Sequence, residues 1–152
     1  IKKEYANCGY LFTKEAIGGG TEFRLRSSAT EDIAMTLFTS AGYYIQQTSD
    51  SGIYQADTWS HIVTTYDGSS STSGIKIYVN GIQVATTSAT GGTYTAMSNT
   101  SAKLLAGCRM DGANAVYNDY AGQLDDIRIY NYELSASQVR SLMNYSATYF
   151  GN

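Results

Sequence analysis

The chain has 152 residues, of which 43% are hydrophobic and only 15% are charged, and its net charge is −3. This length suits one domain with its own core, and the aromatic content excludes a disordered chain. Ten scattered Lys and Arg residues in an acidic chain argue against a nucleic-acid surface, and no apolar run is long enough to span a membrane. The 17 serines, 17 threonines and 14 tyrosines are typical of an extracellular or cell-surface β protein.

Strand patterns dominate the chain. Alternating apolar and polar residues, together with β-branched and aromatic segments, predict strands. The predicted strands cover residues 9–15, 21–26, 32–39, 43–48, 59–67, 75–79, 82–87, 102–109 and 120–130, and the polar stretch 88–99 is expected to be a loop. Asn80-Gly81 lies between two apolar runs and predicts a type I′ hairpin, whose turn needs positive φ at both central residues.

One helix is predicted over about residues 136–144. Ser135 can cap it, and Gln138 completes a capping box. Its apolar stripe consists of Leu134, Val139, Leu142 and Met143. Strands do not alternate with helices, so a parallel sheet is not expected. We therefore predict a single domain over residues 1–152, an all-β antiparallel jelly-roll β-sandwich with one short C-terminal helix.

Cysteines and asparagines suggest possible covalent modifications. Cys8 and Cys108 lack the spacing of a zinc site or a CxxC motif. They are either two unpaired thiols or one disulfide formed in an oxidising compartment, and the composition favours the disulfide. Asn99-Thr100-Ser101 and Asn144-Tyr145-Ser146 match the N-glycosylation pattern, which also arises by chance, so Asn99 and Asn144 are candidate acceptors.

Two segments resemble laminin G-like, concanavalin A-like jelly-roll domains. In TWSHIVTTYDGSSSTSGIKIYVNGIQVATT, at 58–87, a Trp begins a strand that ends in Tyr-Asp-Gly, and a Tyr-Val-Asn-Gly hairpin follows. AGQLDDIRIYNYELSASQVRSLM, at 121–143, is similar to the family's last strand and closing helix. The resemblance covers roughly residues 9–144 and implies a laminin G-like sandwich. Such folds include lectins, carbohydrate-binding modules, adhesive domains, fibre subunits and some glucanases, so the ligand stays open.

The resemblance has a gap at the N-terminal side. Family members usually have two or three strands before the segment that matches residues 9–15, and here only residues 1–8 precede it. An open sheet edge would then present unpaired N–H and C=O groups. Three alternatives follow: the chain is an excerpt, a partner supplies the strands, or the N-terminal segment is rearranged. Residues 1–8 are long enough for one extended strand, which predicts head-to-tail strand donation between identical subunits.

Catalytic patterns are missing from the sequence. A glucanase needs two carboxylates at strand spacings of two or four residues, and the glutamates Glu4, Glu15, Glu22, Glu31 and Glu133 do not show them. Asp125 and Asp126 are adjacent, so on a strand they point to opposite faces. The single histidine, His61, is more simply a half-buried strand residue than part of a triad. We therefore expect no enzymatic activity.

A structural calcium ion is implied by the family resemblance. Its ligand would be the first acid of the Gly-hydrophobe-Asp-Asp motif, Asp125. Calcium binds six to eight oxygens, and the preceding loop supplies Asp111, Asn114, Asn118 and Asp119. Alternatively, Asp125 caps backbone groups or pairs with Arg128 or Lys103.

Tyrosines are the candidates for glycan binding, because the C–H face of a sugar stacks on an aromatic ring. The first candidate group is Tyr43, Tyr44 and Tyr54 with Gln46 and Gln47, and the second is Tyr117 and Tyr120 beside Asn118 and Asp119. Tyrosine is also common in strands, so clusters arise without a ligand.

Two functions are consistent with these features of the sequence. The first is a non-catalytic structural or adhesive subunit of a surface fibre or filament that assembles with identical subunits through sheet-edge pairing. The alternative is a carbohydrate-binding, lectin-like module of a larger secreted protein.

Overall fold

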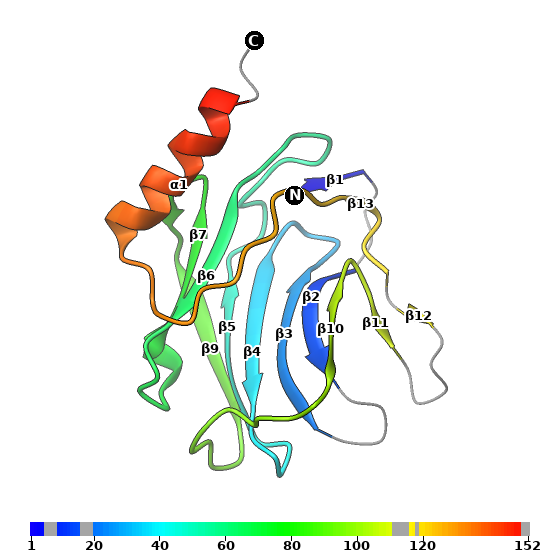
Figure 1. Ribbon diagram of the computed structural model, residues 1–152, viewed down its shortest axis with the longest axis vertical. Coiled ribbons are helices and arrows are strands. Elements are labelled where there is room, and N and C mark those ends of the chain that lie inside the picture. Colours follow the sequence, from blue (N-terminus) through cyan, green and yellow to red (C-terminus); the bar gives the residue numbers. More distant parts are fainter. Residues whose placement is uncertain (5–8, 16–19, 111–115, 118, 150–152) are drawn as a thin grey trace.

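The computed structural model in Figure 1 describes the chain except residues 5–8, 16–19, 111–115, 118 and 150–152. Its strands are β1 (Lys2–Lys3), β2 (Gly9–Glu15), β3 (Thr21–Ser27), β4 (Ile33–Phe38), β5 (Tyr44–Ser49), β6 (Ile62–Tyr66), β7 (Ile75–Val79), β8 (Ile82–Gln83), β9 (Thr86–Gly91), β10 (Lys103–Ala106), β11 (Arg109–Met110), β12 (Val116–Tyr117) and β13 (Gly122–Gln123). A 3₁₀ turn, η1 (Thr72–Gly74), precedes β7, and the helix α1 spans Ala136–Tyr149.

A six-stranded antiparallel sheet, in the order β10-β2-β3-β4-β5-β9, forms one layer of the domain. Its inner face carries apolar residues at alternate positions, such as Leu37 and Ile45, which are each 2% exposed. The second layer is the three-stranded sheet β6-β7-β8. Ile75 of β7 packs against Leu37 and Ile45, and Ile77 packs against Ile33 of β4. The predicted antiparallel β-sandwich is therefore confirmed.

The hairpin between β7 and β8 has the predicted turn. Asn80 has φ of 49° and Gly81 has φ of 77°, as a type I′ turn requires. The predicted strand at 82–87 is wrong in its extent, because the chain leaves this sheet after β8. It then enters the other layer as β9, which pairs with β5. The expected loop at 88–99 is therefore a strand as far as Gly91.

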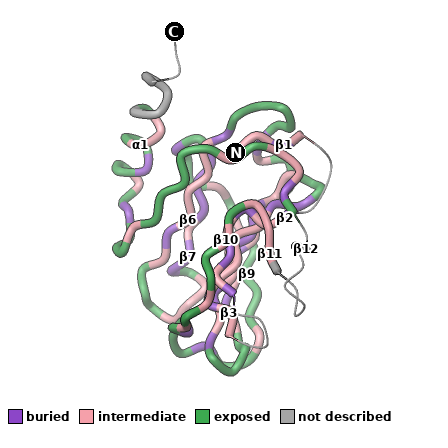
Figure 2. Tube along the Cα trace, turned by 45° about the vertical axis from the view of Figure 1, so that its right-hand side comes forward, coloured by how far each residue is buried: buried purple, intermediate pink, exposed green. Residues whose placement is uncertain are grey.

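The predicted strand at 120–130 is only partly formed. Gly122–Gln123 pairs with β1 as β13, whereas residues 124–130 pair with no strand among the described residues. Figure 2 shows the chain between β13 and α1 as mostly exposed. Ile127 is 50% exposed and Ile129 is 61% exposed. The sequence alternates as a strand does, but a strand also needs a neighbour.

The capping box that the sequence predicts begins the helix. The Ser135 backbone N–H donates to Gln138 Oε1 at 2.8 Å, and the Gln138 backbone N–H donates to Ser135 Oγ at 3.3 Å. Leu134 and Val139 pack against Tyr78 of β7. The helix extends beyond the predicted end at residue 144 to Tyr149. In the described part of the chain, no helix is long and apolar enough to cross a membrane.

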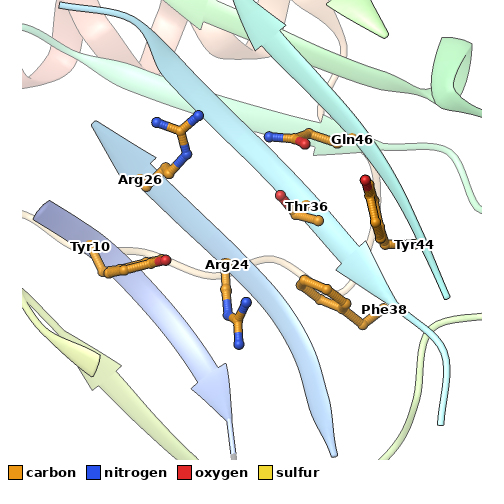
Figure 3. Close-up of a pocket in the computed structure, with 7 residues that line it drawn as sticks. All are labelled: Tyr10, Arg24, Arg26, Thr36, Phe38, Tyr44 and Gln46. Atoms are coloured by element: carbon orange, nitrogen blue, oxygen red, sulfur yellow. The ribbon is translucent and has the colours of Figure 1, made fainter. Parts of the chain in front are cut away.

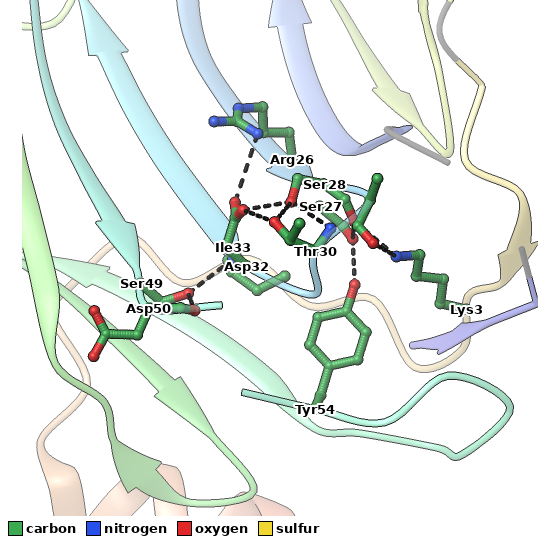
Figure 4. A network of polar contacts seen from close by, with 11 residues as sticks. Lys3, Arg26, Ser27, Ser28, Thr30, Asp32, Ile33, Ser49, Asp50 and Tyr54 are labelled. Carbon is green, nitrogen blue, oxygen red and sulfur yellow. Dashed lines mark hydrogen bonds and ion pairs between the residues drawn. The ribbon is translucent and has the colours of Figure 1, made fainter. Parts of the chain in front are cut away.

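The strand β1 is fixed within its own domain. Lys3 is 1% exposed, and its ammonium group donates to Ser28 O at 2.8 Å and to Glu31 Oε1 at 2.6 Å. Figure 4 shows this group beside a network that includes the hydroxyl–hydroxyl contact of Ser27 with Tyr54. This corrects the expectation that residues 1–8 donate a strand to a neighbour, because Lys2–Lys3 pairs internally with β13. Residues 5–8 lie outside the described part.

Candidate functional site on the outer face of the six-stranded sheet

An open hollow of about 250 Å³ lies on the outer face of the six-stranded sheet. Figure 3 shows its seven lining residues on β2, β3, β4 and β5: Tyr10, Arg24, Arg26, Thr36, Phe38, Tyr44 and Gln46. The antiparallel register brings them together. Arg24 is opposite Thr36, and Thr36 is opposite Gln46, and directly paired residues share one face of a sheet.

One buried carboxylate, that of Glu15, orients two guanidinium groups at this face. Arg24 Nε donates to Glu15 Oε2 at 2.7 Å, and Arg109 Nε donates to Glu15 Oε1 at 2.8 Å. The Glu15 side chain is 6% exposed. The guanidinium carbon of Arg24 also lies 4.9 Å from the centre of the Phe38 ring, a cation–π geometry. Arg24 is therefore held from two sides.

Arg26 is the more accessible guanidinium of the hollow. Its side chain is 34% exposed, and its Nη1 lies 3.6 Å from Asp32 Oδ1. That separation is longer than a good hydrogen bond. Arg26 can therefore donate to an acceptor in the hollow while it stays close to a carboxylate.

The aromatic wall of the hollow consists of Phe38 and Tyr44, whose ring centres are 5.9 Å apart. Tyr44 is opposite Gly91 of β9. A Cβ atom at Gly91 would lie 2.2 Å from Tyr44 Cε1, so only glycine leaves room for the ring there. The Tyr44 ring thus packs against the backbone of β9 at Gly91.

The predicted tyrosines separate into different environments. Tyr44 lines the hollow, and Tyr43 next to it is 47% exposed. The expectation is wrong for Tyr54 and Tyr120, which are 5% and 8% exposed in one core cluster, so their rings are not accessible to a sugar. The Tyr117 side chain lies outside the described residues.

The two predicted glutamines also differ. Gln46 lines the hollow, whereas Gln47 faces inward and donates to Thr72 O at 3.0 Å. Sequence reasoning missed Tyr10, Arg24, Arg26 and Phe38. The alternation Glu-Phe-Arg-Leu-Arg at 22–26 placed both arginines on one face, but the strand order that joins them to Phe38 and Tyr44 is a property of the fold.

The expected calcium ligands do not form a cluster in the described part of the chain, where no group of three His, Cys, Asp or Glu side chains could hold a metal ion. Asp125 Oδ1 accepts a hydrogen bond from the Asp126 backbone N–H at 2.8 Å, which resembles the expected capping alternative. Asp119 is exposed, and Asp111 lies outside the described residues. The calcium site stays a prediction.

Three of the four residues predicted to carry a disulfide or a glycan lie in the described part of the chain. Cys108 is half-buried and forms no disulfide with any described residue, and Cys8 lies outside the described residues. The structure thus provides no support for the expected disulfide, which stays a prediction. Asn99 and Asn144 are both exposed, as glycosylation of either would require.

The sequence matches the family model Laminin_G_3, described as the concanavalin A-like lectin/glucanases superfamily, over residues 4–140. The chain belongs to this family. The laminin G-like fold that the sequence implied is therefore confirmed. No curated protein matches the sequence of this laminin G-like domain.

One solved structure similar to this laminin G-like domain is an S-layer domain-containing protein, residues 221–444, from Clostridium thermocellum ATCC 27405. The two share 21% sequence identity, with a TM-score of 0.44. The similarity covers 94% of this chain and 66% of that chain, so this chain spans just under two thirds of the solved segment.

Proposed function

We propose that this laminin G-like domain is a non-catalytic, glycan-binding adhesive module of an extracellular or cell-surface protein. The hollow on the outer sheet face supports this function best. It combines an aromatic wall with the amide of Gln46 and the guanidinium groups of Arg24 and Arg26. A sugar ring stacks on aromatic side chains, and its hydroxyl or carboxylate oxygens accept hydrogen bonds from amides and guanidinium groups.

The lining of the hollow favours binding over cleavage. Hydrolysis by the common glycosidase mechanism needs two carboxyl groups that flank the bond. None of the seven residues that line the hollow is an Asp or a Glu. The nearby Glu15 carboxylate is outside the lining, and its oxygens accept hydrogen bonds from two arginines.

A glycan array tests this proposal with the wild-type chain and the variants Tyr44→Ala and Arg26→Ala. We expect selective binding by the wild type, and roughly tenfold or greater weakening in each variant, because each loses a stacking surface or a charge-assisted hydrogen bond. Tyr132→Ala is the control, because Tyr132 is 56% exposed and precedes α1, outside the hollow. Absence of binding to any glycan, or equal binding by all four proteins, would contradict the proposal.

A second candidate is a structural subunit of a surface fibre or filament. Among the described residues, β6 is an edge strand of its sheet, which favours this function, since an open sheet edge is a template for pairing with another chain. Identical subunits would assemble through such edges, with a donor other than β1. Gel filtration across a concentration series tests self-association directly.

A further inference from the structure

Cationic side chains gather on the outer face of the six-stranded sheet. The whole chain is acidic, with 13 Asp and Glu residues, ten Lys and Arg residues and a net charge of −3. Arg24 and Arg26 nevertheless line the hollow, and Arg109 reaches the same face through its 2.8 Å contact with Glu15. Lys103 of β10 is exposed and directly opposite Glu15. The outer face therefore differs in charge from the chain as a whole.

Carboxylates in the described structure offset these charges only in part. Glu15 is shared by two arginines, Arg24 and Arg109. Asp32 lies 3.6 Å from Arg26. Three arginines in this group thus face two carboxylates, which leaves one positive charge in excess. Such an excess favours an anionic ligand over a neutral one.

Arg26 is the cation that is best placed to hold an anion. Its neighbour Asp32 already accepts a hydrogen bond from Thr30 Oγ1 at 3.0 Å. Within the described residues, Arg26 itself makes only the 3.6 Å contact with Asp32. Arg24, by contrast, donates to Glu15 at 2.7 Å. The N–H donors of Arg26 are therefore available, and a guanidinium group presents two parallel donors that fit the two oxygens of a carboxylate.

Neutral polar groups surround the same position. Figure 3 shows the Gln46 amide and the Arg26 guanidinium group pointing toward one another, with Thr36 on the strand between them. An amide and a hydroxyl can each donate a hydrogen bond to a carboxylate oxygen. The seven lining residues include no Asp or Glu that would repel an anion. This end of the hollow thus suits a carboxylate.

The number of available cations limits the charge of the ligand. Arg24 and Arg109 already donate to Glu15, which leaves Arg26 as the accessible guanidinium group of the hollow. A densely sulfated chain carries charges on most of its sugars and needs a row of cations to pair with them. One guanidinium group instead pairs with one isolated carboxylate.

The distance between Tyr44 and Arg26 indicates the size of the ligand. Arg24, Thr36 and Gln46 are directly opposite one another and form a row across three strands. Tyr44 precedes Gln46 by two residues and Arg26 follows Arg24 by two, so they lie on opposite sides of this row. Two strand spacings of about 4.8 Å and four residues of about 3.3 Å place their Cα atoms roughly 16 Å apart. A ligand that contacts both is therefore longer than one sugar ring.

We propose that the hollow binds an acidic oligosaccharide with isolated carboxylates. The carboxylate of a uronic acid, or of another acidic sugar, accepts hydrogen bonds from Arg26 and Gln46, while a linked sugar stacks on Tyr44. The ligand class is thus neither a neutral nor a densely sulfated glycan. This inference rests on the proposed function and adds to it the charge and the minimum length of the glycan.

Matched pairs of glycans test the charge of the ligand without any variant. The array carries oligosaccharides that contain a uronic acid, each printed beside its carboxyl methyl ester, together with neutral and sulfated glycans. Esterification removes the charge and keeps the sugar backbone. We expect the wild type to bind acidic oligosaccharides, and to bind their esters about tenfold or more weakly, because a hydrogen bond to an ionised acceptor is about twice as strong as a neutral one.

The outcomes of this array separate the inference from the proposed function. Equal binding to acids and esters, or stronger binding to neutral or sulfated glycans, would overturn the acidic ligand and leave glycan binding intact. Absence of binding to every glycan would contradict both.

Substitutions of arginine locate the charge that the acid recognises. Isothermal titration calorimetry measures the affinity for the tightest acidic oligosaccharide and for its ester. We expect Arg26→Gln to weaken binding of the acid about tenfold and to leave that of the ester nearly unchanged. Arg128→Gln is the matched control, because it removes the same charge from a side chain that is 41% exposed and outside the lining of the hollow.

Thermal unfolding first establishes that both variants are folded. A folded Arg26→Gln variant that keeps the full preference for the acid would overturn the role of Arg26, as would an equal loss of preference in Arg128→Gln. Salt provides a further readout on the wild type. Rising salt should weaken binding of the acid more than binding of the ester, because ions screen the attraction between charges. Equal salt dependence of the two ligands would also contradict recognition of the carboxylate.

Discussion

The ammonium group of Lys3 lies 2.6 Å from Glu31 Oε1, and the Lys3 side chain is 1% exposed. This ion pair connects β1 to the turn between β3 and β4 across the end of the sandwich. A lysine so deeply buried requires complete pairing of its charge. Two backbone carbonyls, Ser28 O and Ala29 O, also accept from the same group. The contact therefore fixes the position of β1.

We predict that Lys3→Ala destabilises the domain by about 3 kcal/mol, because it leaves Glu31 and two carbonyls without their donor. Urea denaturation measures the change. Lys2→Ala is the matched control. Lys2 lies 4.0 Å from Glu4, and both side chains are partly exposed, so we expect a cost below about 1 kcal/mol. Equal effects of the two substitutions would contradict the role assigned to Lys3.

From the geometry of the turn between β7 and β8, we predict that Gly81→Val lowers the free energy of unfolding by more than about 1 kcal/mol. A β-branched residue resists the φ of 77° found there, and a Cβ atom would lie 3.2 Å from Met143 Sδ. Gly81→Asn should cost less, since asparagine tolerates this conformation. Thermal unfolding compares the two variants, and a valine variant as stable as the asparagine one would refute the account of the turn.

His61 predicts a dependence of stability on pH. Its pKa is lowered, mainly by burial and further by the N-terminal ammonium group, and its Nδ1 is buried without a hydrogen-bond partner in the described structure. The folded state then binds fewer protons than the unfolded state, so protonation of His61 destabilises the fold. The stability that goes with a neutral His61 is complete above the unfolded pKa of about 6.5. It is lost as the pH falls through the lower folded pKa.

The variant His61→Gln isolates this contribution. We expect its free energy of unfolding to change less between pH 7 and pH 5 than that of the wild type, as measured by urea denaturation at each pH. If both proteins lost stability in parallel, other groups would cause the pH dependence.

Calcium at Asp125 stays a prediction that a melting curve can decide. If the ion binds, added calcium should raise the melting temperature, and Asp125→Ala should remove that increase. Asp57→Ala is a suitable control, because Asp57 is an exposed aspartate outside the predicted ligand set. A wild-type melting temperature that calcium does not change would exclude the site.

The Cys8–Cys108 disulfide also stays a prediction. Closing a loop of about 100 residues is worth about 4.7 kcal/mol in the chain-entropy model, less any strain. Mass spectrometry of protein secreted into an oxidising compartment, alkylated without reductant, gives the answer. Two alkylated thiols would contradict the predicted disulfide.

Much of the fold could be predicted because the relevant signals are local. The Asn80-Gly81 turn and the Ser135–Gln138 capping box depend on a few adjacent residues, and both form as the sequence indicates. Residues 124–130 have a strand pattern but no strand partner in the described chain, and pairing is a long-range property. Alternation within a segment cannot reveal whether a neighbour is present.

The candidate site was less predictable for the same reason. Tyr44 and Gln46 were identified because they are polar or aromatic neighbours in the sequence. Tyr10 and Arg26 join them only through the strand order β2-β3-β4-β5. Tyr54 appears equivalent to Tyr44 in the sequence, yet its ring is buried in the core. Burial depends on how the two sheets pack, which no single segment encodes.

The most direct test of the proposed function is an NMR titration of the labelled domain with the glycan that binds most strongly on the array. We predict that the amide shifts concentrate on the outer face of β2, β3, β4 and β5, with the largest changes near Arg26, Tyr44 and Gln46. Shifts confined to other surfaces, or no shifts at saturating glycan, would contradict glycan binding at this hollow.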